Sequence, residues 1–475
     1  MGNHGGGGAE LPVELIPTVL GYLRWRTGDL AACCRTSRVW RRFATPALYE
    51  RVWLRDQTRL VRVFATLAAH PELAHMVHVL ELRVFPFGLP AERLELLEAQ
   101  IVAALRHATH LEVLRWTRTG SLSNRLLLEM FEKMECLREL EISGNSRSWT
   151  PDVLLQHMPS TVRDLSVVLP DRAVVHALVP LATQLQGRLE GLGLLCLDSA
   201  LVSDSLLESL AQHTRNLRRL SLVGCRSVHG AGVQALVLGT PQLQHLALEG
   251  LPLVRGVLVS LAPALHCLRT LTLTYPWRAE DAPRFFTELG TVVDACHALR
   301  SLAVYARGGS PPVLNGVRMQ DGNASPAESV RESPSLSTTF VHRLLASRAA
   351  ETLRVLRIHG IAVSLAQLRD IGASPLAARL EELVVHLFDA DLPSLQEALR
   401  PFLELRHLHI LSHLRSHANL SEGDILVLAR NCGPWISQIG FRNRVWVVQH
   451  APVISLRRWD MGAGTFPESM LVVRA

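Results

Sequence analysis

Lysine is the residue whose scarcity in this chain bears most directly on chemistry. Lys133 is the only lysine, against 48 arginines. A phosphate-binding Walker loop needs Gly-Lys followed by Ser or Thr, whereas Lys133 lies between Glu132 and Met134 in a helical pattern. A protein kinase needs a lysine on a strand. The sequence therefore argues against both classes of nucleotide enzyme. Codon bias is one explanation for the scarcity, since Ile, Asn and Tyr are also sparse.

Histidines near the C-terminal end are spaced so that they share one face of a strand. His407 and His409 are two residues apart, and His386 lies one repeat earlier. Three imidazoles could hold a metal ion. Solvent-facing histidines are the simpler interpretation, and we expect neither a metal nor a cofactor. The eight cysteines contain no Cys-x-x-Cys pair, which predicts reduced, mostly buried thiols in a cytosolic or nuclear protein.

Common catalytic motifs are missing from the sequence, which has no His-Glu-x-x-His, Gly-x-Ser-x-Gly or Gly-x-Gly-x-x-Gly. The net charge of +6 is spread over 475 residues without a long basic tract, so we expect no nucleic-acid partner. Charged residues and prolines interrupt every apolar run before the roughly 18–20 residues that a membrane span needs. We therefore expect a non-catalytic protein that binds neither nucleic acid nor membrane.

A six-residue pattern, in which positions one, four and six are apolar, recurs along most of the chain. The clear copies begin at Leu111, Leu137, Val162, Leu192, Leu217, Leu243, Leu268, Leu299, Leu353, Leu380, Leu405 and Ile436. A weaker copy begins at Val77. Most intervals are close to about 25 residues, within the range of leucine-rich repeats.

Each copy predicts a short strand with one buried face. The stretch that follows often predicts a helix, as in residues 203–214, where Leu206, Leu207, Leu210 and Ala211 form an apolar stripe. A single strand and helix cannot bury that stripe, whereas stacked neighbours can. The predicted fold is therefore an α/β leucine-rich-repeat solenoid, a horseshoe with a parallel sheet on its concave side.

The N-terminal segment 10–44 has a different, helical pattern. Leu15, Val19, Leu20 and Leu23 fall on one face of a helix that we expect to begin near Pro17. Further short helices are predicted at 27–34 and at 37–44, the latter ended by a proline. A segment this small cannot usually bury enough surface to be stable by itself. We expect either the rest of the chain or another protein to cover it.

This segment resembles an F-box, in particular that of fungal F-box domain-containing proteins. The resemblance rests on Leu11-Pro12, Glu14-Leu15, Asp29-Leu30 and the run Ser37-Arg38-Val39-Trp40-Arg41. Residues 217–236 are similar to the cysteine-containing leucine-rich repeat that is common in F-box proteins, with Cys225 closing the strand. The sequence "ALYERVWL" and the C-terminal end also look like segments of fungal members.

The resemblance implies a substrate-recognition subunit of an SCF-type cullin–RING ubiquitin ligase, without catalytic residues of its own. The F-box would bind the adaptor subunit, and through it the cullin, while the repeats capture an unknown protein substrate. The residues expected to contact the adaptor are Leu11, Pro12, Leu15, Ile16, Val19, Leu20, Leu23 and Leu30. Few lysines would then also mean few sites for ubiquitin attachment to the receptor itself.

A second interpretation treats the N-terminal helices as a cap over the open end of the solenoid. The chain would then be a leucine-rich-repeat scaffold or a GTPase-regulator-like binding protein. Recruitment of the adaptor by residues 10–44 separates the two interpretations.

The strand residues between the buried positions predict the concave surface. Early copies place Glu139, Glu141 and Asp164 there. Late copies place Arg357, His359, His386, His407, His409 and Arg442 there. Because arginine pairs well with carboxylate and phosphate, we expect an acidic or phosphorylated substrate segment at the C-terminal half. A solvated surface of mixed charge is the alternative.

The expected domain boundaries follow from these patterns. They are a disordered Gly-rich tail at 1–9, the F-box at 10–54, a helical linker at 55–76, repeats at 77–305, a disordered insertion at 306–338, repeats at 339–441 and a C-terminal cap at 442–475. The insertion contains three Ser-Pro steps, which suit either proline-directed phosphorylation or an inert linker. The expected location is cytoplasmic, nuclear or both.

Overall fold

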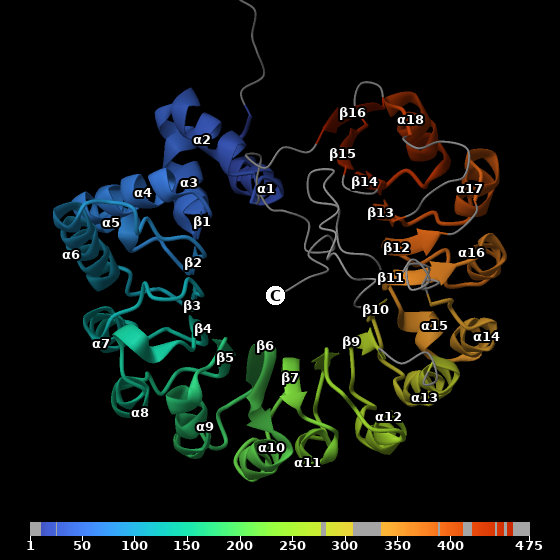
Figure 1. Ribbon diagram of the computed structural model, residues 1–475. Coiled ribbons are helices and arrows are strands. Elements are labelled where there is room, and N and C mark those ends of the chain that lie inside the picture. The colour runs from blue at the N-terminus through green and yellow to red at the C-terminus, as the bar shows by residue number, and fades with distance from the viewer. Residues whose placement is uncertain are drawn as a thin grey trace, which may run out of the picture. The chain divides into compact units, whose positions relative to one another are not determined.

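The computed structural model describes residues 11–24, 26–276, 282–306, 334–387, 390–411, 420–441, 444–450 and 454–458. They form two units, one within Met1–Leu185 and the other within Gln186–Trp459. Each unit is a stack of strand–helix repeats (Figure 1). Among the described helices, none has both the length and the apolar character needed to cross a bilayer.

Among the described residues of the first unit, five parallel strands pair in chain order. They are β1 (Arg51–Leu54), β2 (Val79–Leu82), β3 (Val113–Trp116), β4 (Glu139–Ser143) and β5 (Asp164–Val168). The register aligns Leu80 with Leu114 and Leu114 with Leu140 across neighbouring strands. These leucines are at most 2% exposed, so the repeated position forms a continuous buried ladder.

Helices cover the outer face of this sheet (Figure 1). They are α4 (Gln57–Ala69), α5 (Pro71–Ala74), α6 (Ala91–His107), α7 (Asn124–Lys133), α8 (Asp152–His157) and α9 (Arg172–Gln184), with a 3₁₀ turn at η2 (Ser146–Ser148). Side-chain caps mark several helix starts: Asp56, Ser123 and Asp171 each accept a hydrogen bond from the backbone N–H three residues later. Lys133 ends α7, exposed, and its Nζ lies 2.8 Å from Glu132.

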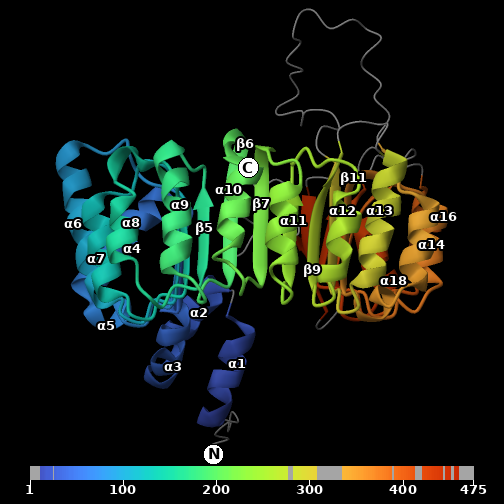
Figure 2. The ribbon, with the colours of Figure 1, turned by 90° about the horizontal axis from the view of Figure 1, so that it is seen from below.

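In the described part of the chain before β1, the short elements are η1 (Val13–Leu15), α1 (Ile16–Tyr22), α2 (Thr27–Thr36) and α3 (Arg38–Tyr49). Figure 2 shows α1, α2 and α3 beyond one end of the strands of this unit. The sequence predicts that the third helix ends before Pro46, and this is wrong, because α3 continues to Tyr49. A proline removes only its own N–H bond, and the carbonyl of Pro46 still accepts the N–H of Glu50 at 2.8 Å.

The second unit continues the same architecture. Its parallel strands are β6 (Gly191–Ser203), β7 (Arg219–Ser227), β8 (His245–Glu249), β9 (Thr270–Tyr275), β10 (Ser301–Ala306), β11 (Val355–Val363), β12 (Glu382–Leu387), β13 (His407–Ile410) and β14 (Gln438–Phe441). Among the described residues, two antiparallel strands follow: β15 (Arg444–Gln449) pairs with β14, and β16 (Ser455–Arg458) pairs with β15. The reversal of strand direction ends the repeat pattern within the expected C-terminal cap.

The outer face of this unit is again helical (Figure 1). Its helices are α10 (Asp204–Ala211), α11 (Ala231–Leu238), α12 (Val257–Leu261), α13 (Ala282–Ala295), α14 (Thr338–Ala346), α15 (Ala349–Thr352), α16 (Leu365–Gly372), α17 (Leu392–Leu399) and α18 (Glu422–Asn431), with a 3₁₀ turn at η3 (Ala262–Ala264). The predicted leucine-rich-repeat fold is thus confirmed: short parallel strands line one side of each unit and helices line the other.

Two positions of the repeat differ from the sequence pattern. The copy assigned to Leu192 begins three residues earlier, because Leu192 pairs with Leu220, the second apolar position of its copy. Leu197, which the pattern would bury, is 67% exposed. The parallel ladder also starts before the expected boundary at residue 77, since β1 already pairs with β2.

Two neighbouring repeats approach closely just before Cys225, which explains the glycine at position 224. Gly224 has φ of +63°, a left-handed conformation that glycine adopts readily, and a β-carbon there would lie 3.0 Å from the carbonyl carbon of Cys196. The thiol of Cys225 is fully buried, 3.5 Å from the carbonyl oxygen of Val223. All eight cysteines carry free thiols.

The expected insertion and termini lie partly outside the described residues. This applies to the tail 1–9, to residues 307–333 of the insertion and to the end of the chain after residue 458. The described end of the insertion is ordered: Leu336 is 6% exposed, its N–H donates to the carbonyl of Ala362, and Ser337 caps α14. The repeat therefore resumes a few residues before residue 339.

Candidate functional site

The three N-terminal helices enclose a small apolar core. Ile16, Leu20, Leu30 and Ala44 are at most 3% exposed. Around them pack the partly buried side chains of Leu23, Cys33, Cys34, Trp40, Phe43, Ala47 and Leu48. Burial of each large side chain stabilises the module by roughly 1.5–3 kcal/mol. Trp40 belongs to this packing.

Polar contacts fix the connection between the second and third helices. The hydroxyl of Ser37 accepts the N–H of Trp40 at 3.2 Å and so caps α3. The guanidinium of Arg41 donates to the carbonyl of Cys34 at 3.0 Å, which satisfies an otherwise open carbonyl near the end of α2. The Ser-Arg-x-Trp-Arg run therefore builds the corner between α2 and α3.

Apolar side chains remain exposed on this module. Leu11, Val13 and Leu15 are 42–47% exposed and follow one another along η1 and the residues before it. Tyr22 on α1 and Val39 on α3 are 84% and 44% exposed. Several exposed apolar residues close together on a small domain are typical of a surface that another protein covers.

The eight residues expected to contact a partner are divided by the structure. Leu11, Pro12 and Leu15 are exposed, and Val19 and Leu23 are half-buried. Ile16, Leu20 and Leu30 lie in the module's own core, and their contact with an adaptor stays a prediction. The sequence pattern identifies an apolar face but does not tell whether the same chain covers it. Val13 and Tyr22 are exposed apolar residues that the sequence argument missed.

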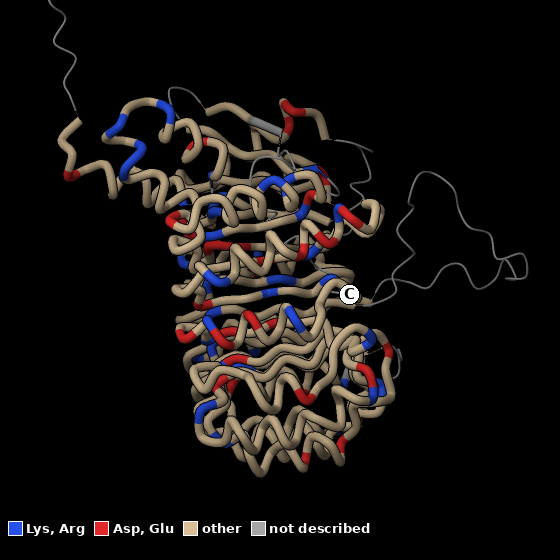
Figure 3. The backbone as a smooth tube through the Cα atoms, turned by 90° about the vertical axis from the view of Figure 1, so that its left-hand side faces the viewer, with Lys and Arg blue, Asp and Glu red and all other residues tan. Residues whose placement is uncertain are grey.

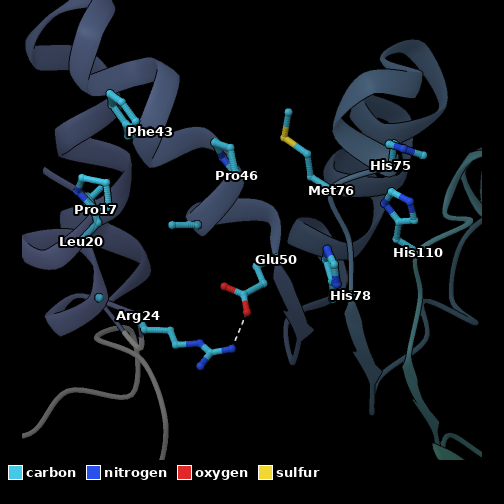
Figure 4. A pocket seen from close by; sticks show the side chains of 12 residues that line it. Pro17, Leu20, Arg24, Phe43, Pro46, Glu50, His75, Met76, His78 and His110 are labelled. Carbon is cyan, nitrogen blue, oxygen red and sulfur yellow. Dashed lines mark hydrogen bonds and ion pairs between the residues drawn. The ribbon is translucent and has the colours of Figure 1, made fainter. Parts of the chain in front are cut away.

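A groove of about 680 Å³ lies between this module and the first repeats (Figure 4). One wall carries Pro17, Leu20 and Phe43, and Arg24 and Glu50 form an ion pair at its edge. The opposite wall carries Met76 and three histidines, His75, His78 and His110. The rings of His75 and His110 lie 3.9 Å apart between centroids. Within the described residues, no group of His, Cys, Asp and Glu side chains is arranged to hold a metal ion.

The basic residues expected on the surface of the C-terminal strands mostly contact other side chains of the same sheet. Arg357 donates two hydrogen bonds to Glu382, at 2.7 and 3.1 Å, and the carboxylate of Glu382 is almost fully buried. His407 Nδ1 lies 3.9 Å from the same carboxylate. Arg357 is therefore already paired within the sheet, and its contact with an acidic substrate segment stays a prediction.

The other late histidines cluster on β11, β12 and β13. Burial, together with the nearby His386 and His409, lowers the pKa of His359 to about 4. His409 is 6% exposed, which corrects its assignment to an open surface. Arg442, the remaining expected contact, lies outside the described residues.

The strand surface of the first unit carries basic as well as acidic side chains, although Glu139, Glu141 and Asp164 alone would indicate an acidic surface. Arg115 on β3 donates to Glu139 at 2.8 Å and lies 3.9 Å from Glu141. The carboxylates that the sequence placed on an acidic surface are thus shared with an arginine. Figure 3 shows basic and acidic residues interspersed on the side of the chain that holds this unit.

Comparison with known families settles the identity of the module. Residues 9–55 match the family model described as F-box-like. The N-terminal module is an F-box-like domain. It includes every helix of the small core and the strand β1. The chain therefore joins an F-box-like domain to a leucine-rich-repeat array, the arrangement of F-box/leucine-rich-repeat proteins.

More distant similarities concern solved structures. The leucine-rich-repeat protein LegL7 from Legionella pneumophila is 13% identical, with 64% of this chain and 93% of that chain covered and a TM-score of 0.37. The complex of Rad7 and Elc1 in yeast is 14% identical, with 86% and 91% covered and a TM-score of 0.40. Both are too remote to say what this chain does. No curated protein matches the chain.

Proposed function

We propose that the chain is the substrate-recognition subunit of an SCF-type cullin–RING ubiquitin ligase. The F-box-like domain binds the adaptor subunit, and the repeat array presents a face to a protein substrate. The chain contributes binding surfaces and no catalytic group, and it works in the cytoplasm, the nucleus or both.

The observation that carries this proposal is the exposed apolar run of the F-box-like domain. Leu11, Val13 and Leu15 keep more than two fifths of their surface exposed although the domain has a core of its own. Covering such side chains with a partner gains roughly 25 cal/mol per Å² of apolar surface. A domain that only capped the array would be expected to turn these residues toward the repeats.

Co-purification tests the proposal. The bait is the full chain beside a variant with Leu11→Ala, Pro12→Ala and Leu15→Ala, incubated with a fungal or insect-cell lysate. All three side chains are exposed, and the hydrogen bond from the N–H of Leu15 to the Pro12 carbonyl involves backbone only. The variant should fold normally while its recovery of adaptor and cullin falls at least tenfold.

A matched control removes three exposed apolar side chains from the second unit, by Leu238→Ala, Val254→Ala and Val259→Ala. This control should recover the adaptor like the unaltered chain. If the unaltered, folded chain recovers neither adaptor nor cullin, the proposal fails and a leucine-rich-repeat scaffold becomes the better interpretation.

A further inference from the structure

One position of the repeat, the residue immediately before each parallel strand, carries a row of arginines in the second unit. At this strand-start position, the backbone carbonyl of one repeat accepts the N–H of the next, which holds the row at one level of the sheet. The carbonyl of Arg269 thus accepts the N–H of Arg300, and the carbonyl of Arg300 accepts that of Arg354, both at 2.8 Å. In chain order, the described residues at this position are Glu190, Arg218, Gln244, Arg269, Arg300, Arg354, Glu381, Arg406 and Ser437.

Glutamates compensate the arginines toward both ends of this row. Arg218 Nε lies 3.8 Å from the carboxylate of Glu190, one repeat earlier. Arg354 Nη1 and Arg406 Nε lie 3.8 and 4.0 Å from the carboxylate of Glu381, which they share. At these places the row itself supplies the carboxylates that its arginines contact.

Arg269 and Arg300, in the middle of the row, have no such compensation. They precede β9 and β10, which pair in parallel register, and both are exposed. Within the part of the chain that the structure describes, neither guanidinium forms an ion pair or donates a hydrogen bond. Arg354 adds a third positive charge before β11, the next strand (Figure 1). Like charges opposite each other on neighbouring strands destabilise a sheet, and proteins keep such conflicts mainly at functional sites.

Two histidines precede the unpaired arginines. His266 and His297 each lie three residues before their arginine, in the loop that leads into the strand, and both are exposed. An imidazole N–H can donate a further hydrogen bond to an anion. Glu351 holds the corresponding place before Arg354. Because a carboxylate there repels an anionic ligand, we expect the ligand to be centred on Arg269 and Arg300.

The spacing of the strands limits the size of the ligand. Neighbouring strands lie about 4.8 Å apart, so the row from Arg269 to Arg354 spans roughly 10 Å. An extended peptide rises about 3.3 Å per residue and covers that distance with roughly three or four residues. Guanidinium groups form strong, bidentate hydrogen bonds with carboxylates. The row therefore suits a short segment in which two or three aspartates or glutamates lie close together.

A nucleic acid fits this row less well. None of the described residues at the strand-start position is aromatic, so a base has no ring there on which to stack. The carboxylates of Glu190 and Glu381 would also repel a phosphate backbone that continued along the row.

We infer that Arg269 and Arg300 bind a short acidic segment of a protein substrate, through the carboxylates of its aspartates or glutamates. The inference rests on the proposed function for the claim that the segment belongs to a substrate. The site is separate from Arg357, which is paired with Glu382 within the sheet. Recognition at this site uses the unmodified side chains of the substrate.

The test measures binding of fluorescently labelled peptide pools to the purified full chain by fluorescence anisotropy at low salt. One pool has three central glutamates between positions that are degenerate over uncharged residues, and a second pool has three glutamines there. We expect the glutamate pool to bind at least tenfold more tightly, and its affinity to fall as salt is added. Equal binding of both pools would overturn the inference. Tighter binding of a labelled thymidine oligonucleotide would overturn it in favour of a nucleic acid.

Matched variants locate the site. Arg269→Ala with Arg300→Ala should weaken binding of the glutamate pool at least tenfold without lowering the urea midpoint, because both side chains are exposed. The control is Arg226→Ala with Arg284→Ala, which removes the same charge from exposed positions near the C-terminal end of β7 and in the first turn of α13. The control should change binding less than twofold. An equal loss in the control would indicate non-specific attraction and contradict the inference.

Adaptor recovery separates this inference from the proposed function. The variant with Arg269→Ala and Arg300→Ala keeps the F-box-like domain unaltered, so it should still recover the adaptor from a lysate. Normal adaptor recovery by an unaltered chain that does not prefer the glutamate pool would refute the inference alone. An unaltered chain that prefers the glutamate pool but recovers no adaptor would refute the proposed function instead.

Discussion

The imidazole of His409 lies against the backbone of Gly440 on the neighbouring strand. A β-carbon at Gly440 would be 2.8 Å from both Cγ and Nε2 of His409, closer than real β-carbons approach other atoms. The two residues are register partners of β13 and β14. The absence of a side chain at Gly440 is therefore what allows a 6% exposed histidine to pack in the sheet.

Gly440→Ala should consequently destabilise the second unit by about 1–3 kcal/mol, as overpacking does. The urea midpoint of unfolding, followed by circular dichroism, measures the change. Adding His409→Ala to Gly440→Ala should restore part of the loss. Gly423→Ala is the control, because the nearest atom there is Ser421 Oγ at 3.5 Å. A normal midpoint for Gly440→Ala would contradict the steric argument.

Buried and exposed leucines of the F-box-like domain should behave differently when shortened. Leu30→Ala empties part of the domain's core and should cost about 2–5 kcal/mol of domain stability. Leu15→Ala changes a 47% exposed side chain and should leave stability within about 0.5 kcal/mol. Thermal unfolding of both variants, beside adaptor recovery, checks this. The structure would be contradicted if Leu15→Ala were the more destabilising change.

The second unit should lose stability between neutral pH and pH 5. The pKa of His359 falls from 6.5 to about 4 on folding, so between these values the unfolded chain binds the proton and the folded chain does not. The free energy of unfolding is therefore highest above pH 6.5, where His359 is neutral in both states, and it declines as the pH falls toward 4. Replacing the histidine, His359→Gln, should flatten the pH dependence of the urea midpoint.

His342→Gln serves as the control for this pH effect, because His342 has a 64% exposed side chain on α14. Its midpoint should follow the pH as the unaltered chain does. An unchanged slope in His359→Gln would show that protonation of this histidine does not limit stability.

Asp204 should hold two neighbouring repeats together. Its carboxylate accepts the N–H groups of His229, Gly230 and Gly232 at 2.9, 3.2 and 2.8 Å, at the start of α11. Asp204→Ala leaves these donors without their acceptor and should cost about 1–3 kcal/mol. Unfolding midpoints in urea measure the loss, with Asp152→Asn, an exposed first-turn aspartate of α8, as control.

The carboxylate of Asp204 should also make the stability of the second unit depend on pH. Burial raises the pKa of Asp204, but the three donated hydrogen bonds outweigh it and lower the pKa below its ordinary value. Its contribution is present above the ordinary pKa of aspartate and is lost as the pH falls through the lowered value. Asp204→Asn should therefore lose less stability than the unaltered chain between pH 5 and pH 3.

Periodicity alone predicts the fold because the same three apolar positions return in nearly every repeat. It fails where two matches overlap: Leu189 and Leu192 both start an acceptable copy, and the pairing of Leu192 with Leu220 and the exposure of Leu197 decide for Leu189. It also fails at Tyr49, which starts a good copy with Val52 and Leu54. That copy follows directly after the helical pattern and resembles the end of the F-box.

The candidate sites are harder to predict, because their contacts join residues about one repeat apart in the chain. The pairs Arg357–Glu382 and Arg115–Glu139 depend on strand register, which sets which side chains face each other. Likewise, Leu15 and Leu20 belong to the same apolar pattern, yet only three-dimensional packing shows that one is exposed and the other buried.

The junction between α3 and β1 has a mechanical consequence. The carbonyl of Glu50, the residue immediately after α3, accepts the N–H groups of His78 and Val79 at 2.9 and 3.0 Å. The last helix of the F-box-like domain therefore enters the ladder without a linker that could swivel. A protein bound to that domain would therefore be held in a fixed orientation. The orientation of that protein relative to β1 and β2 would then be set by the backbone itself.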